Sequence, residues 1–296
     1  MQIGAVVRLG AWAQTGQAAS YADIRDMACR VEDAGFDSIW VYDHFFLRWP
    51  ERPTVATWEG WTTLSALAQA TTRVQLGTMV LCVPFRNPAI VAKMASTLDE
   101  ISGGRLILGL GAGWHEPEFT ATGAPFDHRA GRFEEALKII CPLLRDGQVD
   151  FEGTFYSARE SELAPRGPRP KGPPIMLAGA GPRMLRLAAR YGDSWNTAWN
   201  TELEAVTRRV HGIRAACTAE GRDPDTLDVN ALAAVHFADL GPAARPSLTG
   251  DVEQLAETLQ RHADLGVRHM IVEVAPYSAA AVDRFARVVE RFRRRR

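Results

Sequence analysis

The sequence predicts an α/β fold in which eight parallel strands close into a (β/α)8 TIM barrel with insertion segments. Short apolar runs alternate with longer amphipathic runs along the whole chain. The short runs are rich in β-branched and aromatic residues and are apolar on both faces, as buried parallel strands are. No linker-like change of composition divides the 296 residues, so we expect one domain over 1–296. A doubly wound open sheet is the rival fold.

The expected elements follow one another in strict alternation. Strands are expected at 3–7, 38–42, 74–81, 106–111, 174–179, 194–199, 228–237 and 269–274. Helices are expected at 20–35, 58–71, 88–102, 128–146, 181–191, 201–220, 250–265 and 278–294. Asn87-Pro88 is a typical helix start, because proline is tolerated in the first turn. Gly35, Gly221 and Gly266 each follow a helical run and are typical C-terminal stops.

Two segments fall outside this alternation. Residues 149–173 form an insertion between the fourth helix and the fifth strand, which begins like a β-hairpin around Gly153 and ends rich in proline. Residues 238–250 form a polar loop after the seventh strand. Loops that follow the strands of a barrel lie at its catalytic face, so the second segment is a candidate lid.

Composition narrows the class of protein. A formal net charge of −1 gives no electrostatic reason to expect a nucleic-acid partner, and we expect the Arg-rich end "RFRRRR" to be a solvated tail. The cysteines are scattered and lack the spacing of metal ligands or of a disulfide framework, so no metal is expected. No signal peptide and no apolar run near the ~20 residues of a membrane span is found. We expect a cytoplasmic protein with a small-molecule partner.

Glycine-rich turns end the fourth and fifth expected strands. "GLGAG" (109–113) lacks the spacing of a dinucleotide fingerprint, which leaves close strand packing or close backbone approach to a flat ligand. "AGAGP" (178–182) fits a phosphate cradle, because small residues before a helix expose free N–H groups at its positive end. A merely tight strand–helix turn is the alternative.

Titratable and aromatic residues also follow the strands. His44, at the end of the second strand, is a candidate general base or cofactor donor, or else a loop histidine. Glu118 is a candidate acid, or a carboxylate favoured near a helix start. Several tryptophans lie near strand ends and would line a pocket for a planar ligand, although core packing also explains some of them. The pocket candidates are Trp49, Trp114, Trp195 and Trp199.

Five stretches together resemble the luciferase-like monooxygenase family, and within it the branch that uses coenzyme F420, a deazaflavin. They are "GFDSIWVYDHF" (35–45), "RVQLGTMVLCVPFRNPAIVAK" (73–93), "LDEISGGRLILGLGAGWHEPEF" (98–119), "FDHRAGRFEEAL" (126–137) and "GPPIMLAGAGPRMLRLAARYGDSWN" (172–196). They occur in family order and cover most of the chain.

The resemblance implies a site at the C-terminal mouth of the barrel. Asp43 and His44 match family positions that contact the deazaflavin ring and the reacting centre. A bulge on the third strand, with a non-prolyl cis peptide matching Met79-Val80, is expected behind the ring, with Cys82 beside it. The family's phosphate segment matches Gly179, Ala180 and Gly181, and its strand-four turn beside the cofactor matches Gly111, Ala112 and Gly113. The resemblance also implies a homodimer.

The chain departs from the family's sugar-phosphate dehydrogenases. Their catalytic glutamate directly after the GxG turn is replaced by Trp114, and no lysine follows the sixth strand. We therefore expect F420-dependent hydride transfer to or from a small, apolar organic substrate. His44 is expected to move the proton, Asp43 to orient the ring and Glu118 to be a second acid. The alternatives are an FMN-dependent monooxygenase that uses reduced flavin and O2, and a non-catalytic flavin- or deazaflavin-binding protein.

Overall fold

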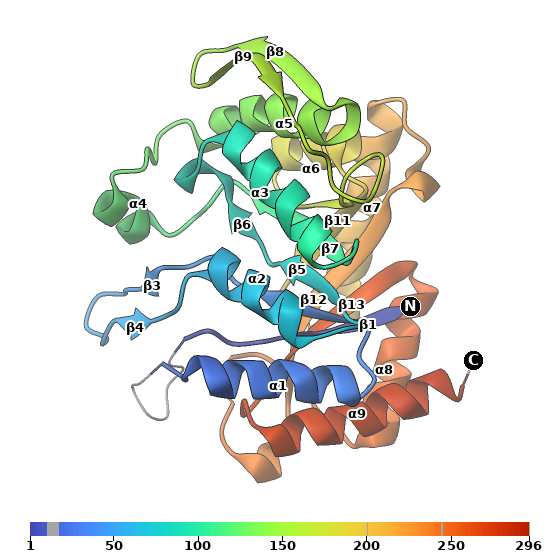
Figure 1. Ribbon diagram of the computed structural model, residues 1–296. Coiled ribbons are helices and arrows are strands. Elements are labelled where there is room, and N and C mark those ends of the chain that lie inside the picture. Colours follow the sequence, from blue (N-terminus) through green and yellow to red (C-terminus); the bar gives the residue numbers. More distant parts are fainter. Residues whose placement is uncertain (11–17, 200, 244, 296) are drawn as a thin grey trace.

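A closed parallel barrel forms the centre of the molecule (Figure 1). The computed structural model describes residues 1–10, 18–199, 201–243 and 245–295. The barrel strands are β1 (Gln2–Val6), β2 (Ser38–Val41), β5 (Gln75–Thr78), β7 (Leu106–Gly111), β10 (Ile175–Ala178), β11 (Ser194–Ala198), β12 (Asp228–His236) and β13 (Val267–Ala275). Because β13 pairs with β1 and β10 pairs with β7, the sheet has no open edge between them. The predicted (β/α)8 barrel is confirmed, and the open-sheet rival is wrong.

Helices cover the outside of the barrel, one after each strand of the alternation (Figure 1). They are α1 (Tyr21–Asp33), α2 (Gly60–Ala70), α3 (Pro88–Ile101), α5 (Arg129–Asp146), α6 (Pro182–Tyr191), α7 (Leu203–Ala219), α8 (Val252–Asp264) and α9 (Ala279–Arg293). Their starts follow local chemistry. The Asn87 side chain accepts the Ala89 N–H ahead of α3, and capping boxes built on Ser20 and Asp251 open α1 and α8.

The core lies in two places. One large cluster of buried side chains fills the space between barrel and helices, and a smaller one packs inside the barrel. Trp40 is the largest member of the inner cluster and is fully buried. It fits because Gly4 and Gly77 stand on the neighbouring strands, where an added Cβ would lie 2.6 Å and 2.1 Å from Trp40 ring atoms. Side chains therefore fill the interior of the barrel around Trp40.

The third strand differs from the expectation of one continuous run over 74–81. It ends at Thr78, a cis peptide joins Met79 to Val80, and β6 (Leu81–Cys82) then pairs in parallel with β7. The interruption coincides with the bulge that the resemblance implied. It displaces the end of this strand at the mouth of the barrel.

Smaller elements project from the barrel. β8 (Gln148–Glu152) and β9 (Ser157–Glu162) form an antiparallel hairpin within the expected insertion, closed where the Gly153 N–H donates to the Tyr156 carbonyl. β3 (Phe46–Leu47), β4 (Val55–Ala56) and α4 (Glu116–Thr122) project from the side opposite to the two chain ends (Figure 1). Single turns of 3-10 helix lie at Val83–Phe85, Pro224–Thr226 and Ala238–Leu240.

The arginine-rich end is more ordered than expected. Within the described residues α9 continues to Arg293, whose guanidinium lies 2.9 Å from both carboxylate oxygens of Asp37, and Arg291 pairs with Glu253. The tail is solvated as predicted, since Arg291 and Arg293 are exposed, but it is not frayed up to this point, because the helix continues and the ion pairs hold it to Asp37 and α8.

All four cysteines are free thiols. No group of three or more histidine, cysteine or acidic side chains in the described part of the chain is placed to hold a metal ion. No helix among the described residues is both long enough and apolar enough to cross a membrane.

Candidate functional site

A cavity of about 810 Å³ opens at the carboxyl ends of the strands. Its wall is formed by the segments that follow β2, β5, β7, β10, β11 and β12. Most of the site residues expected from the sequence line it: Asp43, His44, Trp49, Met79, Val80, Cys82, Gly111, Ala112, Gly113, Trp114, Glu118, Gly179 and Trp199. A cavity of this size in this place is the usual ligand site of a TIM barrel.

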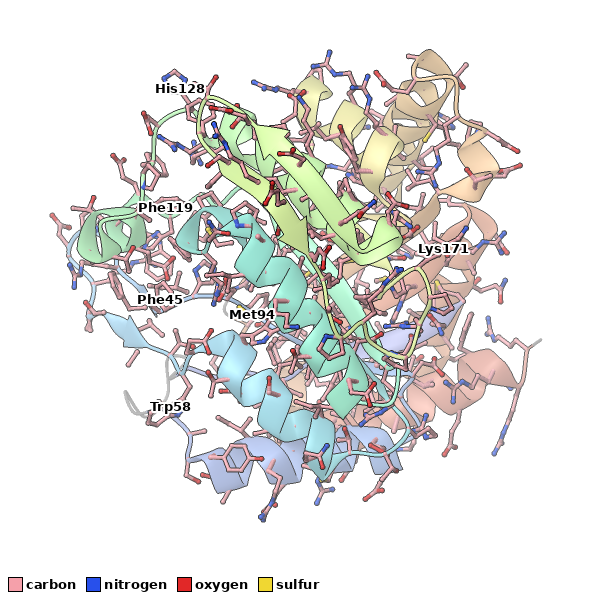
Figure 2. The ribbon with its side chains drawn as sticks, turned by 45° about the horizontal axis from the view of Figure 1, so that its top comes forward. Phe45, Trp58, Met94, Phe119, His128 and Lys171 are labelled. Atoms are coloured by element: carbon pink, nitrogen blue, oxygen red, sulfur yellow. The ribbon has the colours of Figure 1, made fainter. Side chains whose placement is uncertain are left out.

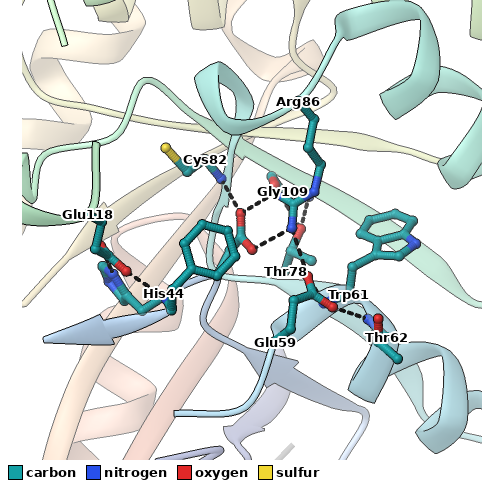
Figure 3. Close-up of polar contacts among 11 residues, drawn as sticks. His44, Glu59, Trp61, Thr62, Thr78, Cys82, Arg86, Gly109 and Glu118 are labelled. Atoms are coloured by element: carbon teal, nitrogen blue, oxygen red, sulfur yellow. Dashed lines mark hydrogen bonds and ion pairs between the residues drawn. The ribbon is translucent and has the colours of Figure 1, made fainter. Parts of the chain in front are cut away.

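A histidine–glutamate pair lies in the wall of the cavity (Figure 3). The Nδ1 atom of His44 is 2.8 Å from Oε2 of Glu118. Oε1 of Glu118 accepts the N–H groups of Phe45, at 2.6 Å, and of Phe46, at 3.3 Å. An ionised carboxylate only accepts hydrogen bonds, so Nδ1 carries the proton and Nε2 is the basic nitrogen of the neutral ring. Glu118 therefore orients His44 and selects its tautomer.

Packed phenylalanines hold the glutamate in place. The ring of Phe85 lies 4.9 Å from that of Phe45 and 4.8 Å from that of Phe119. Figure 2 shows Phe45 and Phe119 on the side where α4 projects, and Lys171 on the opposite side. Since Phe119 follows Glu118 directly on α4, this packing fixes the helix against the loop after β2. The side chain of Glu118 is only 1% exposed.

Aromatic rings surround the outer part of His44. The Trp114 ring meets the His44 ring edge-on at 5.5 Å. His115 lies between Trp49, at 5.7 Å, and Trp114, at 5.0 Å. The His115 Nε2 accepts the Arg48 N–H, and burial lowers the pKa of His115, so this second histidine is neutral and already occupied. The sequence reasoning passed over His115, although it stands within "GWHEPE".

Asp43 has a different set of partners. Its carboxylate receives two hydrogen bonds from Arg86, of 2.7 and 2.8 Å, and one of 2.8 Å from the Cys82 N–H (Figure 3). Arg86 also donates to Glu59, which caps α2 through the Trp61 and Thr62 N–H groups. The carboxylate thus ties the end of β2 to β6, just past the cis peptide. Neither Arg86 nor Glu59 was singled out from the sequence.

The thiol of Cys82 is unsuited to act as a nucleophile. Cys82 is 6% exposed, and burial raises its pKa, with the neighbouring Asp43 carboxylate acting in the same direction. The residue lines the cavity as a protonated thiol.

The turn after β7 is packed so closely that side chains are excluded. A Cβ added to Gly111 would lie 2.5 Å from Val80, and one added to Gly113 would lie 2.6 Å from the Cys82 sulfur. Gly113 also has a φ of +76°. Arg129, at the start of α5, donates to the Gly113 carbonyl at 2.8 Å. The glycines therefore bring the bare backbone of this turn to the wall of the cavity.

The turn after β10 leads from the cavity to the start of α6. Gly179 lines the cavity, whereas Ala180 and Gly181 are exposed at its rim and are not among the residues that line it. Gly181 is the N-cap of α6 and Pro182 its first residue, and no side chain caps this end. An added Cβ on Gly181 would meet nothing within 4 Å. The positive end of the helix dipole is thus open to a ligand.

The prediction that Trp195 lines the substrate pocket is wrong. Ser194, Asn196 and Ala198 alternate with Trp195 along β11, and successive side chains of a strand point to opposite faces. Trp195 is 1% exposed and packs in the core between barrel and helices. Its indole N–H donates to the Gly179 carbonyl at 2.9 Å, so it supports the glycine turn from behind.

Another part of the cavity wall carries Tyr42, Trp199 and Arg245. The Tyr42 hydroxyl donates to Glu273 at 2.7 Å, and burial, together with that carboxylate, raises the Tyr42 pKa well above its ordinary value. Tyr42 therefore keeps its proton. The Arg245 guanidinium lies 4.0 Å from the Trp199 ring centre, a cation–π contact. Arg245 comes from the expected lid segment 238–250, of which Ala244 lies outside the described residues.

The fold and this cavity define a TIM barrel with a ligand-sized cavity at the carboxyl ends of its strands. A family model described as luciferase-like monooxygenase matches residues 1–269. The chain belongs to the luciferase-like monooxygenase family, as the resemblance of its motifs had indicated.

Two relatives and one solved structure are similar to the chain. An F420-dependent glucose-6-phosphate dehydrogenase of Amycolatopsis mediterranei (strain U-32) is 35% identical over 193 residues, which are 64% of this chain and 56% of the relative. An enzyme of the same name from Kineococcus radiotolerans is 32% identical over 76% of this chain and 68% of its own length. An F420-dependent secondary alcohol dehydrogenase, solved with an F420–acetone adduct, is 22% identical, has a TM-score of 0.83 and covers 98% of both chains. That last likeness supports the fold.

Proposed function

We propose that the chain is a coenzyme F420-dependent oxidoreductase that interconverts an alcohol and a carbonyl group on a small, largely apolar substrate. The observation that carries the proposal is the His44–Glu118 pair in the wall of an aromatic cavity. The relatives that share its sequence are named F420-dependent dehydrogenases.

The residues present fit a deazaflavin. The ring would lie against Met79-Val80 and the turn at Gly111–Gly113, where a Cβ on either glycine would collide with its neighbours. The phosphate would lie at Gly179–Gly181, where the start of α6 is open. When bound, the deazaflavin accepts or supplies a hydride.

His44 would handle the proton of this reaction. In alcohol oxidation the Nε2 lone pair would accept the proton of the hydroxyl oxygen, while the carbon that bears this hydroxyl would give up its hydride to the bound cofactor. In the reverse direction protonated His44 returns that proton to the carbonyl oxygen. Glu118 holds the ring by Nδ1 and stabilises the imidazolium charge, much as the aspartate of a catalytic triad does. Glu118 is thus proposed as a positioning residue in place of the second acid expected from the sequence.

The wall of the cavity favours an uncharged or weakly polar substrate. Trp49, Trp114 and Trp199 present large apolar surfaces, and Trp114 stands directly after the Gly113 turn. Of the charged groups there, Asp43 and Glu118 are committed to Arg86 and His44. The cationic side chains of the wall are also engaged, since Arg129 donates to the Gly113 carbonyl and Arg245 lies over the Trp199 ring. We therefore expect poor turnover of glucose 6-phosphate in spite of the relatives' names.

The test is cofactor binding followed by turnover. Purified protein is titrated with F420 and with FMN by fluorescence. The absorbance of F420 is then followed with secondary alcohols, and that of reduced F420 with ketones. We expect F420 binding, turnover of an apolar substrate, and a His44→Ala variant that binds F420 normally but loses about 100-fold or more in turnover. Binding of FMN alone would replace the proposal by the monooxygenase reading. Binding without turnover over the whole panel would favour the non-catalytic reading.

A further inference from the structure

Asn196 carries an unsatisfied amide at the cavity wall. It lies in the middle of β11, is 2% exposed and lines the cavity. Neither Oδ1 nor Nδ2 has a hydrogen-bond partner among the described residues. Gln75 and His262 also each have one buried side-chain atom without a hydrogen-bond partner in the described chain, but neither residue lines the cavity.

A neighbouring asparagine shows how the fold satisfies such a group when it is structural. Asn230 stands beside Asn196 on β12 and is 4% exposed. Its Nδ2 donates to the Ser194 hydroxyl at 3.2 Å and contacts the Met176 sulfur at 3.3 Å. Asn196 instead has Ala178 beside it on β10 and apolar Leu232 on the same wall. Because a buried amide without partners destabilises a fold, its retention here points to a partner that arrives with a ligand.

The amide specifies the chemistry of that partner. A carboxamide offers one acceptor and two donors side by side, so it is satisfied by a ligand edge with an N–H next to a C=O. A reacting ketone only accepts hydrogen bonds and would leave Oδ1 unpaired. The single proton of a reacting alcohol hydroxyl is directed at His44 in the proposed reaction, so it does not satisfy Oδ1 either. The pyrimidinedione edge of a deazaflavin or flavin ring alternates C=O and N–H groups.

We propose that Asn196 is a cofactor-binding residue that pairs through its amide with the pyrimidinedione edge of the ring. The inference rests on the proposed function, since it takes the deazaflavin as the ligand of this cavity. It adds β11 to the cofactor site, where neither sequence motif nor resemblance had placed a contact residue for the ring edge.

The test separates folding from binding. Asn196→Leu replaces the amide by an apolar group of similar size, and Asn196→Ala removes it without crowding. Asn230→Ala, on the neighbouring strand and outside the cavity lining, is the matched control. We expect the ligand-free Asn196→Leu protein to unfold at the same temperature as wild type or higher, because the unpaired amide is gone. F420 and FMN are titrated into each protein by fluorescence. The Kd of each cofactor that binds wild type is expected to rise by about 10- to 100-fold in both Asn196 variants and to stay near wild type in the control.

Two negative outcomes have different meanings. If wild type binds F420 and a folded Asn196 variant binds it equally well, the inference is overturned while the proposed function stands. If wild type does not bind F420, the proposed function itself is wrong, and the inference that rests on it is wrong as well. Should Asn196→Leu not fold, the Asn196→Ala protein decides the question alone.

Discussion

Arg86 holds the Asp43 carboxylate by two hydrogen bonds of 2.7 and 2.8 Å, with the Asp43 side chain 2% exposed. Asp43 stands directly before His44, so this pair fixes the backbone that carries the proposed base. The same carboxylate takes the Cys82 N–H just past the Met79-Val80 peptide. One ion pair therefore sets the positions of two walls of the cavity.

Removing one member of this pair is expected to destabilise the protein strongly. Arg86→Met leaves the Asp43 charge buried with the Cys82 N–H as its remaining partner, and we expect a loss of about 3–5 kcal/mol in the free energy of unfolding. Urea denaturation measures it. In an Asp43→Asn background no charge is stranded, so the same Arg86 substitution should cost at least about 2 kcal/mol less. Equal costs in both backgrounds would show that the two side chains are not coupled.

Glu118→Gln tests the tautomer argument. The Gln oxygen can still accept the Phe45 N–H, but its NH2 group would then face Nδ1 of His44 and drive the ring proton to Nε2. We expect kcat to fall by about 10²–10⁴ while the Kd for F420 stays within about twofold of wild type. Glu116→Gln, on the exposed side of the same helix, is the matched control and should be near wild type. A parallel loss of F420 binding would indicate a structural role for Glu118.

Gly181→Asp tests the proposed phosphate position without a steric penalty. Gly181 has an ordinary φ of −72° and open space around its Cβ, and aspartate is a better N-cap than glycine. We expect unchanged or slightly higher thermal stability together with at least about tenfold weaker F420 binding, because a carboxylate then occupies the anion site. Gly181→Ser has the same capping chemistry without charge and should bind normally. Wild-type affinity in the Asp variant would place the phosphate elsewhere.

The barrel, its helices and most of the cavity wall were predictable from the sequence because they depend on local patterns. Strand ends determine which residues reach the mouth, so Asp43, His44 and the glycine turns could be placed together without coordinates. The orientation of β11 could not, because both faces of a barrel strand are buried, so the alternation of Ser194 and Asn196 with Trp195 does not tell which face turns into the barrel. That ambiguity explains why Trp195 was assigned to the pocket and Asn196 was missed.

Side-chain pairings were beyond prediction for a related reason. Arg86 and Asp43 are 43 residues apart, and His44 and Glu118 are 74 apart. Their contact depends on how the chain turns after β5 and on where α4 packs. Sequence spacing indicates which groups stand at one edge of the barrel, but the partner that each one reaches follows from that packing.

The pH dependence of stability is expected to come partly from His269, which is 3% exposed inside the barrel. The Trp40 N–H donates to the Ser38 oxygen, and the Ser38 hydroxyl lies 2.7 Å from the His269 Nε2, within hydrogen-bond distance. Burial lowers the pKa of His269 from 6.5 to about 4. Between these two values the unfolded chain is protonated at this residue and the folded chain is not, so stability falls as the pH falls. Below about 4 both states are protonated, and this contribution stops changing.

Urea denaturation at pH 7 and pH 4.5 measures this loss in the free energy of unfolding. His269 should contribute about 2–3 kcal/mol to it, because each pH unit below 6.5 costs roughly 1.4 kcal/mol. His269→Gln keeps a side chain that can hydrogen-bond to the Ser38 hydroxyl but does not titrate, so its loss over the same interval should be smaller by that amount. The buried His115 and His262, whose pKa values are also lowered by burial, are present in both proteins and act in the same direction. Since they cancel in the comparison, an unchanged pH dependence in His269→Gln would mean that His269 is protonated in the folded barrel.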